Sequence, residues 1–293
     1  MAITINTNLS SMIVQNNLAK STSQLNSAIE RMTTGYKINH AADNAAGYSI
    51  ARNWEAQLGS LDVAADNAAT GADMLATLED NYALISSHVQ RVRDLTEQAS
   101  NGTYGEQSKK AIQSEIQARL DEINRIAANC EFNSVNLMAG GTTAGTPGKD
   151  GIDIQVGLDG RASKSRIHLN SDLFADGSVT GLFGSDDQLA KKCAGLVTGS
   201  GNTAQDQLAK IDTVINTISN RITTLGAAQN RIESAIESIG VQSENITSSL
   251  STLRDADVAT ESSNYIKAQI LQQASATLLS TANQSPSIAL NLL

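Results

Sequence analysis

The feature that most constrains the fold is a long series of apolar residues spaced alternately three and four apart. It begins at Leu208 and ends at Leu253, and only Gln229 and Ser243 interrupt it. Such a heptad register keeps one seam of a helix facing a partner helix. At about 1.5 Å per residue, an unbroken helix of this length extends roughly 70 Å. The series therefore predicts one long helix whose inward positions include Ile232 and Ile236.

Three further stripes follow the same spacing. One runs from Leu61 to Val92, with small residues in its first half and large residues in its second half. A shorter stripe runs from Ile112 to Cys130, and another from Leu18 to Met32. Aromatic residues make up only 3% of the chain, which is too few for a thick globular core. The sequence predicts a mainly α fold, a long antiparallel helical bundle of coiled-coil type.

A different texture separates the helical stripes. The segment from Gly140 to Gly151 is rich in Gly, Thr and Ala and is typical of a loop. Ile152 to Val156 and Arg166 to Leu169 then alternate apolar and polar residues on either side of a turn at Leu158-Asp159-Gly160. This pattern predicts a small β-hairpin at about 152–169. Residues 171–204 are mixed and rich in glycine, which indicates a short insertion.

Charge and composition exclude several partners. The net charge is −9, whereas a nucleic-acid surface requires a basic face. No run of 18 apolar residues occurs, so no membrane span is predicted. The start, MAITINTNLSSM, lacks the features of a cleavable secretory signal. Two cysteines make no disulfide framework, and we interpret Cys130 as a small core residue and Cys193 as a free thiol.

The residues that catalysis requires do not converge in this sequence. The three histidines are far apart and form no zinc-binding pair. The loop GTTAGTPGKD has Thr143 and Asp150 where a phosphate-binding loop requires Gly and Ser or Thr. Asp150, Asp153 and Asp159 have no glutamate that closes a calcium loop. We therefore predict no catalytic residue, no metal and no cofactor, and expect a protein that is not an enzyme.

Both ends of the chain carry apolar helical stripes. The simplest cover for the stripe from Ile266 to Thr281 is the stripe from Leu18 to Met32. Two helices cannot bury a full apolar circumference, so part of the surface stays open as an interface. A head-to-tail contact repeated on every copy gives a helical filament, while a monomeric bundle is the alternative. The predicted interface residues are Leu18, Leu25, Ile29, Met32, Ile266, Ile270, Leu271, Leu278, Leu290, Leu292 and Leu293.

Pro286 divides the last of these residues from the others. A proline removes one helical hydrogen bond, so we expect Leu290, Leu292 and Leu293 not to continue the preceding helix. Their expected cover is a neighbouring copy of the chain.

Several long segments resemble bacterial flagellin. They are MAITINTNLSSM, RMTTGYKINHAADNAAGYSIA (31–51), QRVRDLTEQASNGTY (90–104), IQSEIQARLDEINRIA (112–127), FNSVNLM (132–138), LGAAQNRIESAI (225–236) and AQILQQA (268–274). The segments are collinear, and the resemblance covers residues 1–140 and about 205–293. It implies a secreted structural subunit of the flagellar filament that serves swimming motility. The outer domain that many flagellins carry in mid-chain is nearly absent.

The resemblance also implies a domain organisation. Residues 1–40 and 254–293 form the terminal polymerisation domain, and residues 41–170 and 205–253 form a helical rod domain with the hairpin. Residues 171–204 are the short variable insertion. The implied partners are further copies of the chain, the flagellar export apparatus and its chaperone, the filament cap and the hook-junction proteins. Export through the flagellar channel requires no cleaved signal.

Flagellins are also ligands of a host Toll-like receptor. The family's receptor-contact segment matches Arg91, Leu95 and Glu115 here, within QRVRDLTEQ and IQSEI. The resemblance implies exposed charges at Arg91 and Glu115 on adjacent helices, with Leu95 as an apolar contact. The alternative is a solvated charged face above a buried Leu95.

Two other functions stay open at the level of sequence. A hook–filament junction protein has similar terminal helices, although KINHAADNAAGYSIA and FNSVNLM favour flagellin. A secreted helical adhesin belongs to a different class and does not need helical seams at both ends. Pelleting of filaments at raised salt distinguishes flagellin from both.

Overall fold

The computed structural model describes the backbone of residues 8–140, 151–159, 165–184 and 202–291. Side chains are described over the same ranges except residues 202–206 and 285–291. The chain divides into two compact units. We call residues 1–58 and 244–293 the terminal unit and residues 59–243 the central unit.

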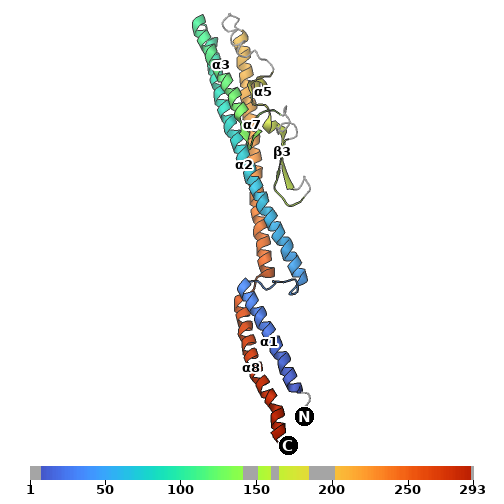
Figure 1. The fold of residues 1–293 in the computed structure, drawn as a ribbon. Coiled ribbons are helices and arrows are strands. Elements are labelled where there is room, and N and C mark those ends of the chain that lie inside the picture. Colours follow the sequence, from blue (N-terminus) through green and yellow to red (C-terminus); the bar gives the residue numbers. More distant parts are fainter. Residues whose placement is uncertain (1–7, 141–150, 160–164, 185–201, 292–293) are drawn as a thin grey trace. The chain divides into compact units, whose positions relative to one another are not determined.

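Long helices dominate both units (Figure 1). They are α1 (Leu9–Thr34), α2 (Ala45–Ser100), α3 (Glu106–Asn129), α7 (Asn202–Arg254) and α8 (Val258–Asn291), with a short α5 (Val179–Phe183). The strands are β1 (Glu131–Phe132), β2 (Val135–Asn136), β3 (Ile152–Gln155) and β4 (Arg166–Leu169), followed by the 3₁₀ turn η1 (Ser171–Phe174). The predicted mainly α fold is confirmed.

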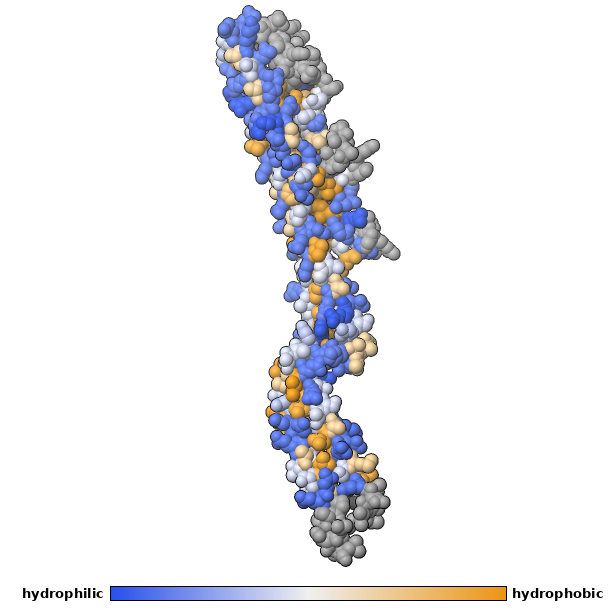
Figure 2. Space-filling view, viewed as in Figure 1, coloured by the Kyte–Doolittle hydropathy of each residue, from blue (hydrophilic) through white to orange (hydrophobic). Residues whose placement is uncertain are grey.

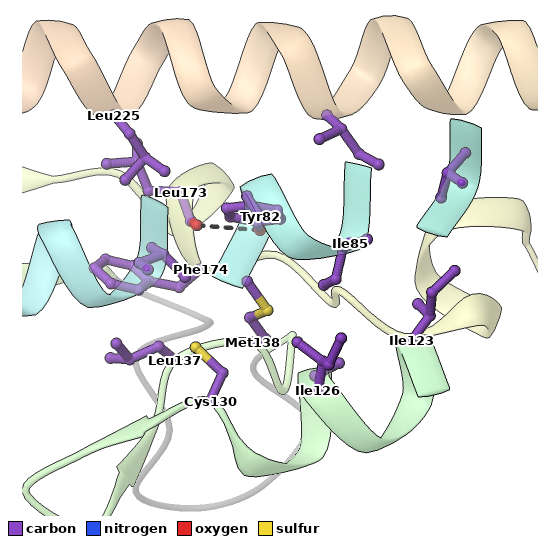
Figure 3. Packing of buried hydrophobic residues seen from close by; sticks show 14 of the residues in the cluster. Tyr82, Ile85, Ile123, Ile126, Cys130, Leu137, Met138, Leu173, Phe174 and Leu225 are labelled. Atoms are coloured by element: carbon purple, nitrogen blue, oxygen red, sulfur yellow. Dashed lines mark hydrogen bonds between the residues drawn. The ribbon is translucent and has the colours of Figure 1, made fainter. Parts of the chain in front are cut away.

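The core of the central unit lies between α2, α3 and α7. Every member of the predicted α2 series from Leu61 to Val92 is buried, as are the α3 positions Ile112, Ile116, Leu120 and Ile123. Figure 3 shows Ile85 of α2, Ile123 of α3 and Leu225 of α7 in this one cluster. Cys130 belongs to the same core, where burial raises the pKa of its thiol to about 11. Its predicted role as a small core residue is confirmed.

The seam of α7 differs from the prediction at alternate positions. Ile211, Ile218, Leu225, Ile232 and Ile239 are buried as expected. Between them, Val214 and Ala228 are also buried, while Ile215, Ile222 and Ala235 are partly buried against the same core and Ile236 is 36% exposed. The apolar stripe of α7 is therefore wider than a coiled-coil seam.

The hairpin pairs β3 with β4 in antiparallel register, with Ile154 opposite Ile167. Its apolar side chains face α2, where the small residues of the α2 stripe leave room for close approach. A Cβ atom on Gly71 would overlap Cδ1 of Ile154, so any larger residue here requires the Ile154 side chain to shift. The predicted hairpin is confirmed, and it supplies the partner of Gly71.

A second, smaller hairpin of β1 and β2 follows α3 and was not predicted. Asn133 and Ser134 form its turn with φ values of 49° and 64°. Two consecutive residues with positive φ are typical of the tight turns that match strand twist. The strands are only two residues long, so no alternating pattern marks them in the sequence.

A buried tyrosine and a half-buried arginine fix the segment after β4 to the long helices. The hydroxyl of Tyr82 lies 3.3 Å from the carbonyl oxygen of Ala175 and 3.5 Å from that of Leu173 (Figure 3). Nη1 of Arg221 donates to Tyr82 Oη at 3.3 Å and to the carbonyl oxygen of Asp176 at 3.0 Å. Burial raises the pKa of Tyr82. These bonds join α2, α7 and η1.

In the terminal unit, α1 and α8 pack antiparallel. The segment that follows α1 is hydrogen-bonded to the segment that precedes α8 at one end of the pair. Gly35 ends α1 in the left-handed conformation with φ of 75°, and its N–H donates to the carbonyl oxygen of Arg31 at 2.9 Å. Tyr36 pairs with Asp255 in an isolated bridge. The guanidinium of Arg254 lies 4.1 Å from the centre of the Tyr36 ring.

The helix α8 continues past Pro286 as far as Asn291, so the expectation that Pro286 ends this helix is wrong. A proline in a helix leaves one carbonyl, four residues earlier, without its usual donor. Here that carbonyl belongs to Ala282, and the side-chain amide of Asn8 donates to it at 2.7 Å. The local cost of the proline is thus offset by a contact from α1.

Candidate self-association surface

The seam between α1 and α8 is made of small and polar residues. Among the described side chains, the buried residues of α8 are Glu261, Ala268 and Ser275, spaced by seven, and those of α1 are Ser21 and Ala28, with the same spacing. Small side chains let two helix backbones approach closely. The pairing of α1 with α8 is thus confirmed, but most of the apolar residues predicted to fill their contact lie outside it.

The predicted interface residues separate into two groups. Leu18 and Leu25 are half-buried in the seam. Exposed residues are Ile29, Met32, Ile266, Ile270, Leu271 and Leu278, with Ile270 and Leu278 at 59% and 57% exposed. With 3.6 residues per turn, Ile266 and Ile270 lie on the face of α8 opposite Glu261, Ala268 and Ser275, whereas Leu271 and Leu278 lie at the edge of the seam. Leu290 lies in α8 beyond the described side chains, and Leu292 and Leu293 lie outside the described residues.

Three exposed apolar residues at the start of α1 extend this surface. Leu9, Met12 and Ile13 have the spacing of one helix face, but they were not among the predicted interface residues. Figure 2 shows hydrophobic residues, in orange, on the surface of the α1–α8 pair. We use the name apolar faces for the exposed residues Leu9, Met12, Ile13, Ile29, Met32, Ile266, Ile270, Leu271 and Leu278.

Polar contacts also cross the seam. Gln272 Nε2 donates to Thr22 Oγ1 at 3.2 Å, and Arg31 Nη1 lies 3.4 Å from Glu261 Oε1. A groove of about 360 Å³ lies between the two helices. Its lining residues are Ser23, Gln24, Ser27, Ala28, Arg31, Glu261, Asn264, Lys267 and Ala268. Burial of the Glu261 carboxylate costs desolvation energy that one ion pair offsets only in part. The pair of helices is therefore weakly held by its own seam.

The three predicted receptor residues lie in two different environments. Arg91 on α2 pairs with Glu115 on α3, with Nη2 and Oε1 2.9 Å apart, and both side chains are exposed. Leu95 is 1% exposed and belongs to the core of the central unit. An apolar surface contact at Leu95 is therefore not available, because this position faces α3 and α7. The exposed feature is the Arg91–Glu115 pair alone.

The described part of the chain holds no group of His, Cys, Asp or Glu side chains that could bind a metal. Asp153 instead contacts His168 Nδ1 at 2.7 Å, while Asp150 and Cys193 lie outside the described residues. None of the described helices is long and apolar enough to cross a membrane.

Comparison with known proteins gives matches over both halves of the chain. Residues 5–143 match the bacterial flagellin N-terminal helical region, and residues 208–293 match the bacterial flagellin C-terminal helical region. The flagellin of Xenorhabdus nematophila is 36% identical over 319 residues and the flagellin of Serratia marcescens 38% over 350 residues, each with full coverage of both chains.

A solved structure of a candidate flagellar hook-associated protein from Vibrio parahaemolyticus is also similar. It has a TM-score of 0.58 and 14% identity, and the match covers 73% of this chain and all of that one. At this identity the likeness shows a shared fold only. The sequence matches, in contrast, extend over the full chain and are to flagellins, which are structural proteins of the extracellular flagellar filament and not enzymes. This chain therefore belongs to the bacterial flagellin family.

Proposed function

We propose that copies of this chain polymerise through the apolar faces of the terminal unit, and that the resulting filament serves swimming motility. The observation that carries the proposal is that α1 and α8 meet through small and polar residues and leave their large apolar side chains exposed. A monomeric helix pair normally has the opposite arrangement. A neighbouring copy is the partner that removes these side chains from water.

The magnitudes support assembly as the main source of order at the chain ends. Burial of one Leu, Ile or Met side chain contributes about 1.5–3 kcal/mol. The apolar faces hold nine such residues in every copy. Ordering a residue costs about 1–2 kcal/mol of backbone entropy, which the weak α1–α8 seam offsets poorly. We propose residues 1–40 and 254–293 as the polymerisation domain and residues 41–170 and 205–253 as the rod domain.

The same faces need cover before assembly and at the filament ends. We propose that the export apparatus and its chaperone receive the chain before it assembles. The filament cap and the hook-junction proteins then contact its first and last copies. Each of these partners would bind apolar helix faces, which this chain presents at both ends.

Sedimentation of the full-length chain at raised salt tests the proposal. Wild type should pellet as filaments, while Ile270→Ser and Leu278→Ser should stay in the supernatant. Gln273→Ser is the matched control, because Gln273 is an exposed polar residue on the same helix. Pelleting of both apolar variants at the level of wild type would contradict the proposal. A wild-type chain that forms no filaments would favour a junction protein.

A second function, recognition by the host Toll-like flagellin receptor, has support from the central unit. The Arg91–Glu115 pair offers two charges on adjacent helices, and Leu95 packs beneath it. A receptor reporter assay tests the role of the pair. Arg91→Ala should weaken the response, whereas Arg125→Ala removes a similar exposed pair, with Glu122, and should not. Equal responses from the two variants would contradict this role.

A further inference from the structure

The helix α8 contains a proline that a helix tolerates only with help. Each N–H of an α-helix donates to the carbonyl oxygen four residues earlier. Pro286 has no N–H, so the carbonyl oxygen of Ala282 lacks the donor that residue 286 would supply. The helix nevertheless continues to Asn291. The carbonyl oxygen of Ala282 is therefore free to accept a hydrogen bond from outside α8.

Asn8 supplies that group from the start of α1. Its Nδ2 donates to the carbonyl oxygen of Ala282 at 2.7 Å, across 274 positions of sequence. Its Oδ1 accepts from the N–H of Ser11 at 3.1 Å and so caps α1. One side-chain amide thus serves one helix with its oxygen and the other helix with its nitrogen.

A second bond lies beside the first. The hydroxyl of Ser11 donates to Oδ1 of Asn283 at 2.8 Å. We call Asn8, Ser11, Ala282 and Asn283, together with Pro286, the clasp. Its bonds depend on one alignment of the two helices, since displacement along the axis moves the Ala282 carbonyl away from Asn8.

At the opposite end of the pair, the N–H groups of Lys37 and Ala256 donate to the carbonyl oxygens of Arg254 and Gly35 and fix the alignment there. Between those bonds and the clasp, the seam itself selects the alignment weakly. Small or polar residues recur every seven positions in both helices, so a shift by one heptad places similar residues opposite each other. Few large apolar side chains fill holes that would oppose such a shift. The carbonyl left open by a proline, in contrast, occurs once in α8, because the chain has only two prolines and the other is Pro147.

We propose that the clasp holds the axial register of α8 against α1 at the end of the pair away from these backbone bonds, and that Asn8 and Pro286 are positioning residues for self-association. The register decides which residues of the two apolar faces lie side by side, and hence whether they form one surface that a neighbouring copy can cover. This inference rests on the proposed function for its biological role. The alignment itself is independent of that function.

A double-mutant cycle between positions 8 and 286 tests the clasp. Asn8→Asp keeps the oxygen that caps α1 but removes the donor to Ala282, and Asn8→Ser repeats this change without a charge, since Asn, Asp and Ser cap helices about equally well. Pro286→Ala restores the N–H that donates to Ala282 within α8. The four combinations are made in the full-length chain.

With Pro286 present, Asn8→Asp should raise the concentration of free subunit in equilibrium with filaments about fivefold, as expected for loss of one hydrogen bond. With Pro286→Ala, the same change should have an effect of less than about twofold, because the carbonyl already has its donor. Asn8→Ser should behave in the same way. Equal effects of Asn8→Asp in the two backgrounds, or no effect in either, would overturn the proposal.

The two proposals fail in different ways. If the wild-type chain forms no filaments, the proposed function is wrong. The cycle is then read from thermal unfolding of the chain, followed by circular dichroism, where Asn8→Asp should lower the midpoint by about 2–4 °C with Pro286 only. Absence of that background dependence overturns the clasp in this case as well.

Discussion

The central and terminal units both repeat residues at heptad spacing, but they bury different side chains. In the central unit, Leu75, Leu78 and Ile85 of α2 are fully buried against residues of α3 and α7. In the terminal unit, the equivalent inward positions of α1 and α8 hold Ser, Ala and Glu. The same spacing therefore supports a complete core in one unit and only a close contact in the other.

The difference shows which unit carries its own stability. A buried leucine contributes about 1.5–3 kcal/mol, whereas a buried serine or alanine contributes far less. The terminal unit also holds the largely buried carboxylate of Glu261. Its large apolar residues, for example Ile270, are at the surface. The central unit thus buries most of its large apolar residues within one copy, whereas the terminal unit leaves most of its own exposed.

The largest expected effect of this difference is on proteolysis. In the free chain, protease should remove residues 1–40 and 254–293 and leave a core of about 45–250, because the weak α1–α8 seam opens often. The fragments are identified by mass spectrometry. In assembled filaments the same ends should be protected. Terminal helices that resist digestion in the free chain as long as α2 does would break the comparison.

Substitutions in the central seam should have the next largest effect. Leu75→Ala and Ile232→Ala should each lower the free energy of unfolding by about 2–5 kcal/mol, since both side chains are completely buried. Glu233→Ala, on the exposed side of α7, should change it by less than about 0.5 kcal/mol. Urea unfolding of the full-length chain measures all three. A loss from Glu233→Ala as large as that from Ile232→Ala would contradict the assigned core.

A smaller effect separates the observed seam of α7 from the one that the sequence favours. Ile236→Ala should cost about 1 kcal/mol or less, because Ile236 is 36% exposed and Ala235 occupies the inward position. The same urea measurement compares it with Ile232→Ala. Equal losses at the two positions would restore the heptad series that includes Ile236.

The sequence predicts the central unit well because large apolar residues mark its seams. The α2 series is correct at every position, and the stripe of α3 is correct as far as Cys130. The α7 series is correct at Ile232 but not at Ile236, because spacing alone does not show how wide the apolar stripe of a helix is. Gln229 interrupts that series. It lies beside the seam, where its Nε2 donates to Oε2 of Glu79 at 2.8 Å.

The seam of the terminal unit could not be predicted in this way. Hydrophobic periodicity selects large residues, so it assigned Ile266 and Ile270 to the contact with α1. Two helices in close contact instead use their smallest residues, here Ala28 and Ala268. The bond from Asn8 to Ala282 left no local signal either, because its partners are 274 positions apart. The continuation of α8 past Pro286 depends on that distant contact.

The smallest expected effect concerns pH and the start of α8. Asp257 accepts hydrogen bonds from the hydroxyl of Thr260 and from the N–H groups of Ala259 and Thr260, and these bonds lower the pKa of its carboxyl below 3.8. A lowered pKa means that the folded state favours the carboxylate. Its contribution to stability is therefore present above pH 3.8 and is lost as the pH falls through the lower value of the folded state.

Because Asp257 caps a helix of the weakly held unit, loss of its charge should be visible first in α8. The helix content of the terminal unit, measured by circular dichroism of assembled filaments, should fall slightly as the pH falls below 3.8. Asp257→Asn keeps a capping oxygen without a titrating group, so its curve should be flatter over this range. Asp66→Asn, on the exposed side of α2 in the central unit, is the control and should leave the wild-type curve unchanged. If Asp257→Asn and Asp66→Asn flatten the curve equally, the pH dependence belongs to the overall charge of the chain, and the terminal unit is no more sensitive to the loss of one cap than the central unit.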